Sequence, residues 1–181
     1  MEIKIILLVF LIFCIKNTEL IACRCEDPGT VKESFDNTTL LIYGEIISFD
    51  YVSIEETMNP EKTKKIRNQL DKSKLLQFES EFIIRVDVRI KNQYKGNVIN
   101  DVTTIFTTRT GASCGFRDFK VGEEFIIYAY RNAGFYYYNY ASSSDIKKGL
   151  GKDGTYWTNH CARTKSGNKA ELKELDSICD Q

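Results

Sequence analysis

Histidine is almost absent from this 181-residue chain, and its scarcity limits the catalytic chemistry that the chain can carry. A Cys–His or Ser–His hydrolase would have to use the single histidine, His160, and a zinc site of the chain's own would lack the usual cluster of ligands. Neighbouring carboxylates such as Glu55 and Glu56 are poor acid–base pairs, because adjacent side chains on a strand point to opposite faces. The sequence therefore predicts a protein that is not an enzyme and needs no cofactor.

An excess of charge of either sign is also absent. Lys and Arg number 25, Asp and Glu number 25, and the formal net charge is zero at pH 7. A nucleic-acid-binding protein normally shows a basic excess on one face. The aromatic stretch at residues 135–140 could stack single-stranded nucleic acid, but without a basic excess we interpret it as a strand that packs in the core. No nucleic-acid partner is expected.

Long hydrophobic runs are missing except at the N-terminus. Residues 5–15 are apolar, which is too short for a membrane span of about 20 residues. Lys4 precedes this run, and a polar break at residues 16–19 and the small Ala22 follow it, as in a secretory signal. We expect residues 1–22 to be a signal peptide and residues 23–181 to form one domain, secreted to the extracellular space or the periplasm.

The cysteines give an odd count after export. Cys14 leaves with the signal peptide, and the mature chain keeps Cys23, Cys25, Cys114, Cys161 and Cys179. Disulfides persist in an oxidising compartment. An odd number means that one thiol is free, joined to another chain, or chemically modified.

Branched and aromatic residues alternate with polar ones over several short segments, which is typical of strands. Five strands are predicted, at residues 40–50, 82–90, 102–108, 124–130 and 135–140. A short helix is predicted at residues 30–35, with Thr30 as N-cap and Glu33 as its capping-box partner, and an amphipathic helix at residues 169–178. Residues 53–80 are read as a solvated loop with a helical patch. The fold class is mainly β, a small closed or nearly closed antiparallel barrel with one or two flanking helices.

Five stretches, taken in order, resemble the tissue inhibitors of metalloproteinases and their netrin-like relatives. The stretches are Cys23-Arg24-Cys25, Tyr94-Lys95-Gly96, Ser113-Cys114-Gly115-Phe116, Glu123-Glu124-Phe125-Ile126-Ile127 and Thr158-Asn159-His160-Cys161. Together they cover most of the mature chain. The resemblance implies a short, single-domain member whose fold is a five-stranded, closed barrel of the oligonucleotide/oligosaccharide-binding (OB) type, with disulfides Cys23–Cys114 and Cys25–Cys161.

The resemblance also implies a function, which is inhibition of a zinc metalloendopeptidase. In that family the free α-amino group and carbonyl of the first cysteine, here Cys23, chelate the catalytic zinc of the protease, because a deprotonated amine offers a lone pair. The side chain of the second residue, Arg24, would enter the specificity pocket. Supporting contacts are expected from Cys25, Ala112 and Ser113.

The chain departs from the family pattern in three respects. Arg24 stands where family inhibitors carry a small or short residue, and burying a guanidinium in an apolar pocket without a partner is costly. No cysteine occurs at residues 34–36, so Cys179 lacks the partner that the family would supply. The separate C-terminal domain of larger family members has no counterpart in the sequence.

An alternative follows from Leu20-Ile21-Ala22-Cys23, which also matches a bacterial lipobox. Lipidation of the Cys23 sulfur and acylation of its amine would remove both the inhibitory group and the Cys23–Cys114 bridge. The chain would then be a surface-anchored lipoprotein, an adhesion or scaffolding module with the same barrel, and only in that case would it contact a membrane. Lipidation of Cys23 would leave an even set of cysteines, Cys25, Cys114, Cys161 and Cys179, which favours this alternative. The polar break at residues 16–19 and the family context of Cys114 favour cleavage of a signal peptide without lipidation.

Overall fold

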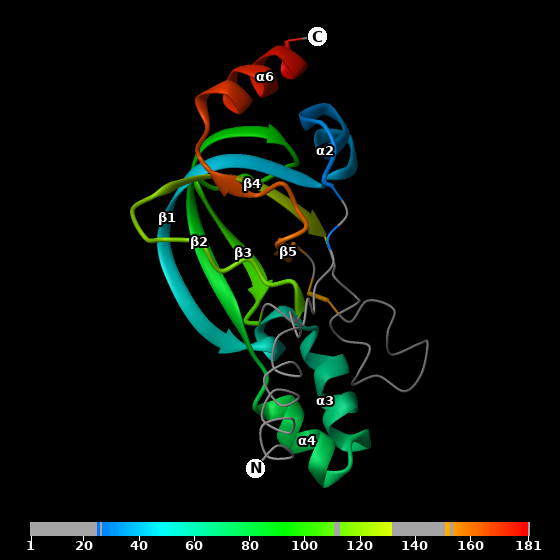
Figure 1. The fold of residues 1–181 in the computed structure, drawn as a ribbon. Helices are drawn as coiled ribbons and strands as arrows, with labels where there is room; N and C mark the ends of the chain where they lie inside the picture. Colours follow the sequence, from blue (N-terminus) through cyan, green and yellow to red (C-terminus); the bar gives the residue numbers. More distant parts are fainter. Residues whose placement is uncertain (1–24, 26, 111–112, 132–150, 153, 181) are drawn as a thin grey trace, which may run out of the picture.

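Five β-strands close into a ring at the centre of the molecule, and a sixth short strand extends the sheet (Figure 1). The computed structural model describes residues 25, 27–110, 113–131, 151–152 and 154–180. The predicted signal peptide and the aromatic stretch at residues 135–140 lie outside these ranges. The strands are β1 (Leu40–Ser53), β2 (Phe82–Lys95), β3 (Val102–Thr108), β4 (Glu124–Arg131), β5 (Tyr156–Trp157) and β6 (Lys165–Ser166).

The ring has the neighbour order β1-β2-β3-β5-β4 and closes where β4 returns to β1. The closing pairs run antiparallel from Leu40 opposite Ala129 to Glu45 opposite Glu124. Among the described strands, β3 and β5 pair in parallel, and all other pairings are antiparallel. The expectation of a purely antiparallel barrel is therefore wrong at this pair, and the mainly β class is confirmed.

Strand β1 serves two neighbours because it bends. Its pairing with β2 shifts register between Leu41 and Ile42, between Tyr43 and Gly44, and again before Ser48. At Gly44 a Cβ atom would lie 2.5 Å from the carbonyl oxygen of Arg89, so only glycine fits this close approach. The strand continues three residues beyond the predicted end at residue 50.

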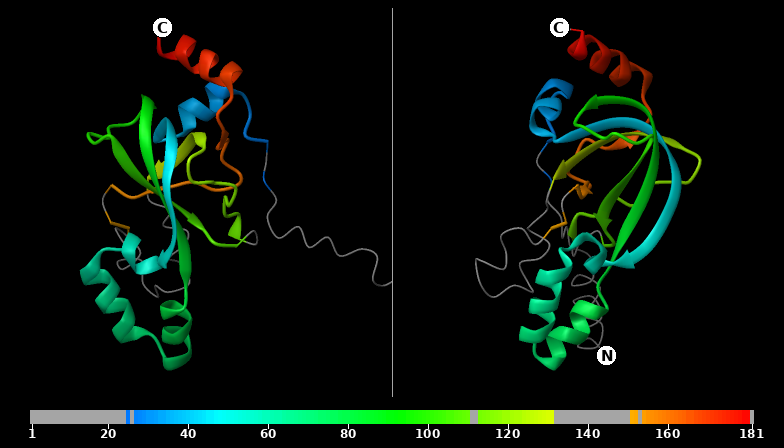
Figure 2. Two further views of the ribbon diagram at one scale, coloured as in Figure 1. Left: turned by 90° about the vertical axis from the view of Figure 1, so that its left-hand side faces the viewer. Right: turned by 180° about the vertical axis from the view of Figure 1, so that it is seen from behind.

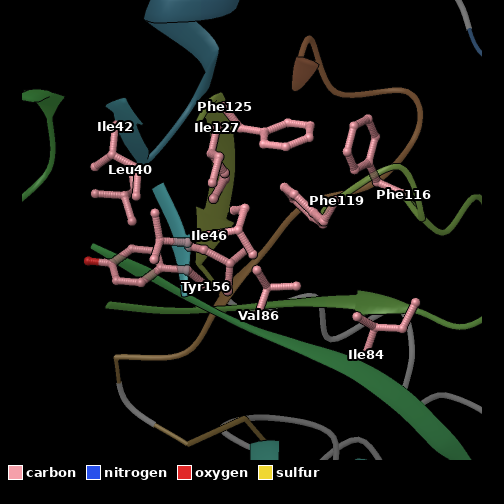
Figure 3. Packing of buried hydrophobic residues seen from close by; sticks show 13 residues of the cluster. Leu40, Ile42, Ile46, Ile84, Val86, Phe116, Phe119, Phe125, Ile127 and Tyr156 are labelled. Carbon is pink, nitrogen blue, oxygen red and sulfur yellow. The ribbon is translucent and has the colours of Figure 1, made fainter. Parts of the chain in front are cut away.

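The interior of the ring is filled by alternate residues of its strands (Figure 3). On β2 the inward set is Ile84, Val86 and Val88, as the alternation predicts, while Phe82 at the strand's start is 43% exposed. The aromatic side chains of Phe116 and Phe119, in the segment before β4, complete the interior. Phe119 packs edge-on to Phe116 and to Phe125 of β4. Strand β4 is buried on both faces, because its outward side chains lie under α2 and α6, which explains its continuous apolar sequence.

Helices cover opposite ends of the ring (Figures 1 and 2). Helix α2 (Val31–Asn37) and helix α6 (Lys169–Cys179) lie at one end, and helices α3 (Pro60–Gln69) and α4 (Lys72–Glu79) lie at the other. The predicted capping box of α2 is confirmed, because Thr30 accepts from the backbone of Glu33 and the Glu33 carboxylate accepts from Thr30. Among the described residues, none of the helices has both the length and the apolarity needed to cross a bilayer.

The connection between β1 and β2 is an ordered part of the core. Ile66 of α3 and Phe78 of α4 are fully buried, in a cluster that includes Trp157 of β5. The prediction of a solvated loop with a helical patch is therefore wrong, because each helix inserts a large apolar side chain beneath a lysine-rich surface. The described residues contain four α-helices, more than the one or two that were expected.

Among the described residues, the fifth strand of the ring is Tyr156–Trp157, which was not among the predicted strands. The strand predicted at residues 135–140 lies outside the described residues. Two residues are too few to show a period of two, so no alternation could reveal this strand. The predicted C-terminal helix is confirmed and ends one residue later than expected, at Cys179.

Replacement of Phe78 by alanine tests whether α3 and α4 belong to the core. The change should lower the free energy of unfolding by about 3–5 kcal/mol, because it empties a fully buried aromatic site. Leu76 on the same helix is 59% exposed and is the matched control, for which Leu76→Ala should cost less than about 0.5 kcal/mol. Urea denaturation measures both, and equal effects would show that this helix does not pack as described.

Candidate functional site

A disulfide fixes the start of the described chain to the side of the ring. Cys25 is bonded to Cys161, which lies between β5 and β6, and the two residues are 136 apart in sequence. This is the pairing that the family resemblance implies. The bond places the segment that leads into α2 against the residues that follow β5.

A second cysteine-containing loop follows β3. The hydroxyl of Thr108 donates to the carbonyl of Ser113 at 2.9 Å, and the hydroxyl of buried Thr107 accepts from the backbone of Phe116 at 2.8 Å. Cys114 has a φ of 58° and is the only non-glycine residue at positive φ in the described part of the chain. Such strained backbone persists only where the surroundings fix it, and it is frequent at functional sites.

The two loops meet because β3 and β5 are parallel neighbours. Parallel strands have their carboxyl ends at the same edge of the sheet, so the residues after β3 and those after β5 lie side by side. The backbone N–H of His160 donates to the carbonyl of Cys114 at 2.7 Å. Cys114 is itself disulfide-bonded, and its partner lies outside the described residues.

We use the name cystine rim for the five residues that this geometry gathers, which are Cys25, Ser113, Cys114, His160 and Cys161. Ser113 and His160 are exposed, and the cysteines are partly buried. The rim can therefore present backbone and small polar groups to another molecule from a support that is covalently fixed. Of the predicted site residues it includes Cys25 and Ser113, whereas Cys23, Arg24 and Ala112 lie outside the described residues.

Two hollows flank the cystine rim. One, of about 160 Å³, is lined by Gly115, Arg117, Asp118 and His160. The other, of about 210 Å³, lies between Ser113 and the end of α4, and its lining includes Glu81 and Arg109. Burial raises the pKa of the Glu81 carboxyl group, against the opposing effect of Arg109. Each could hold one side chain of a partner protein.

A larger hollow of about 530 Å³ lies elsewhere, along β3 and the loop before it, and contains none of the predicted site residues. Its lining combines apolar residues such as Ile99 and Val102 with charged residues, some of which are ion-paired. Arg85, for example, is paired with Asp50 and Glu56. We assign no function to it.

Sequence reasoning identified the cysteines of the rim but not its polar framework. The bond from His160 to Cys114 joins residues 46 positions apart in the chain, and nothing in the composition of either loop indicates it. The only signal was that both residues lie in motifs of the family resemblance.

Cys179 carries a free thiol at the end of α6. Burial, and then the neighbouring carboxylates of Asp180 and Asp176, raise the pKa of this thiol. It is therefore held mainly as the unreactive thiol at neutral pH. Elsewhere at this end of the ring, Lys95 of β2 donates to the carbonyls of Phe35 and Asp36 in α2.

Within the described ranges, no group of three or more His, Cys, Asp or Glu side chains is arranged to hold a metal ion. Comparison with known proteins gives no assignment, because no model of a protein family matches the chain and no curated protein matches its sequence. The site must therefore be interpreted from its own geometry.

Replacement of Gly115 by alanine tests the packing of the Cys114 loop. A Cβ atom at residue 115 would lie 1.8 Å from the backbone oxygen of Thr108, which cannot move without disturbing β3. Gly115→Ala should therefore lower the free energy of unfolding by about 1–3 kcal/mol or more, because of overpacking. Ser113→Ala, in the exposed part of the same loop, should change it by about 0.5 kcal/mol or less. Thermal or urea denaturation measures the stability of the two variants. A Gly115→Ala variant as stable as the wild type would contradict the loop geometry.

Proposed function

We propose that this protein is a secreted inhibitor of zinc metalloendopeptidases, similar in action to the tissue inhibitors of metalloproteinases. The observation that carries the proposal is the cystine rim, in which the bond from Cys25 to Cys161 and the hydrogen bond from His160 to Cys114 hold the N-terminal segment beside Ser113. A competitive inhibitor needs such rigidity, because a preorganised segment loses less entropy on binding.

The finer description of the fold belongs to the same proposal. We infer that the five-strand ring is a barrel of the OB type. The ring order, the parallel β3–β5 pair and the closing β1–β4 pair support this inference. In this proposal the domain spans residues 23–181, after removal of a signal peptide at residues 1–22.

Cys23 is proposed as the zinc-chelating residue and as the partner of Cys114. The disulfide state of Cys114 supports this assignment, because its partner is none of the described cysteines. With its sulfur in a bridge, Cys23 would keep a free α-amino group and a carbonyl, two donors that can displace the water of a catalytic zinc. Cys25, Ala112 and Ser113 would then contact the protease around the metal.

A surface-anchored lipoprotein is the second candidate, favoured by the sequence Leu20-Ile21-Ala22-Cys23. The same barrel would then act as an adhesion or scaffolding module without inhibitory activity. Mass spectrometry of the mature N-terminus separates the two candidates. A diacylglyceryl group on Cys23 would support anchoring and exclude the inhibitor, whereas an unmodified N-terminal cystine would support inhibition.

Addition of one alanine before Cys23 should abolish inhibition. The extension converts the α-amino group into an amide, which has no lone pair available for zinc. The protein with an alanine added after Gln181 is the matched control and should inhibit as the wild type does. Hydrolysis of a fluorogenic peptide by a panel of zinc endopeptidases measures the effect, and undiminished inhibition by the N-terminal extension would refute the chelation mechanism.

Arg24 should limit the range of proteases that are inhibited. Arg24→Ser should strengthen inhibition of enzymes with apolar specificity pockets by at least about tenfold, because burial of an unpaired guanidinium costs several kcal/mol. Arg24→Lys retains the charge and should leave inhibition weak. Inhibition constants of both variants against one such enzyme provide the comparison, and equal constants would remove Arg24 from the specificity site.

A further inference from the structure

The carboxylate of Glu171 is the only charged side chain among the buried residues that the structure describes. Glu171 lies in the first turn of α6, and its side chain is 3% exposed. Its oxygens accept from the hydroxyl of Tyr128 on β4 at 2.9 Å and are paired with Arg163 and Lys165. Burial, and then the nearby carboxylate, raise the pKa of Tyr128, so the phenol keeps its proton and remains a donor.

Arg163 connects this carboxylate to the N-terminal segment. Its Nε donates to Oε2 of Glu171 at 3.2 Å, and its Nη1 donates to the backbone carbonyl of Gly29 at 2.7 Å. A guanidinium presents its donors in a rigid, planar fork, so fixing one side of the group also fixes the direction of the other side. The carbonyl of Gly29 is therefore held at a position defined by α6 and β4.

The segment between β5 and β6 thus holds the N-terminal segment at two points. Cys161 binds Cys25 through the disulfide, and Arg163, two residues later, binds Gly29 through the hydrogen bond. A single disulfide fixes the place of a chain but leaves several rotatable bonds about which its direction can change. The second anchor restricts this freedom, together with the hydroxyl of Ser34 in α2, which donates to the carbonyl of Pro28 at 2.8 Å. The turn at Gly29, which has a φ of 73°, leads into the capped start of α2.

We propose that Arg163, held in place by Glu171, is a positioning residue that sets the direction of the N-terminal segment through Cys25 and thereby the affinity for the target protease. The consequence for affinity rests on the proposed inhibitory function. The positioning itself does not, since it concerns only the order of residues 27–29. In this proposal Glu171 of α6, near the end of the sequence, orients the N-terminal segment through Arg163.

Lys165 allows this role to be separated from a contribution to stability alone. Both Lys165 and Arg163 are paired with Glu171, but among the described residues Lys165 has no hydrogen bond or ion pair with residues 27–29. Arg163→Met and Lys165→Met therefore each remove one cation from the same carboxylate. Only Arg163→Met releases the carbonyl of Gly29.

The experiment compares the two variants in the full mature protein by three measurements. Heteronuclear ¹⁵N NOE values of Asp27 and Gly29 report the order of the N-terminal segment, urea denaturation reports stability, and peptide hydrolysis reports inhibition of a zinc endopeptidase. In Arg163→Met the NOE values should fall towards those of a flexible chain, and the inhibition constant should rise roughly tenfold, which corresponds to about 1.4 kcal/mol. In Lys165→Met the NOE values and the inhibition constant should stay within twofold of the wild type, even where stability is lost.

Unchanged NOE values in Arg163→Met, or the same decrease in Lys165→Met, would overturn the proposal. Arg163→Gln provides a second variant in case the methionine variant does not fold, because its shorter amide can still bond Glu171 but cannot also reach Gly29. It should reproduce the loss of order. If the wild type inhibits no zinc endopeptidase while the NOE values respond as expected, the proposed function fails and the positioning role stands.

Discussion

The return of β4 to β1 is the constraint on which the rest of the structure depends. It requires β1 to bend at Gly44, where a side chain would collide with the backbone of Arg89. Once the ring is closed in this order, β5 must lie between β3 and β4 and run parallel to β3. That single parallel pair brings the loops after β3 and β5 to one edge, and the cystine rim is the result.

Sequence patterns predicted the parts of this fold that repeat with a period. The alternation of apolar and polar residues predicted β2, and the helical spacing of apolar residues predicted α6. The capping box of Thr30 and Glu33 located the start of α2. Helices α3 and α4 were predicted only as a helical patch in a loop, although Asn59 and Asp71 are N-caps. Helix α3 has Ile66 among several lysines, and α4 is only eight residues long, so neither shows a clear helical period. A two-residue strand such as β5 has no period, and only closure of the ring defines it.

The candidate site was predictable only as far as its cysteines. The order of motifs implied the bond between Cys25 and Cys161, which the structure contains. The contacts that orient this bond join residues far apart in the chain, and the hydrogen bond from Arg163 to Gly29 spans 134 positions. Such contacts depend on how α2 and α6 pack against β4, which local sequence does not encode.

The buried carboxylate of Glu171 also acts through contacts that the local sequence does not indicate. A buried ion pair is weak evidence for stability, because well-packed apolar residues of similar volume are often as stable or more stable. What the charge supplies is direction, since Glu171 holds the guanidinium of Arg163 in one orientation between α6 and the N-terminal segment. Apolar packing would keep α6 on the ring but would leave the carbonyl of Gly29 without its donor. The bond at Gly29 therefore complements the disulfide at Cys25, because one fixes where the segment lies and the other fixes where it points.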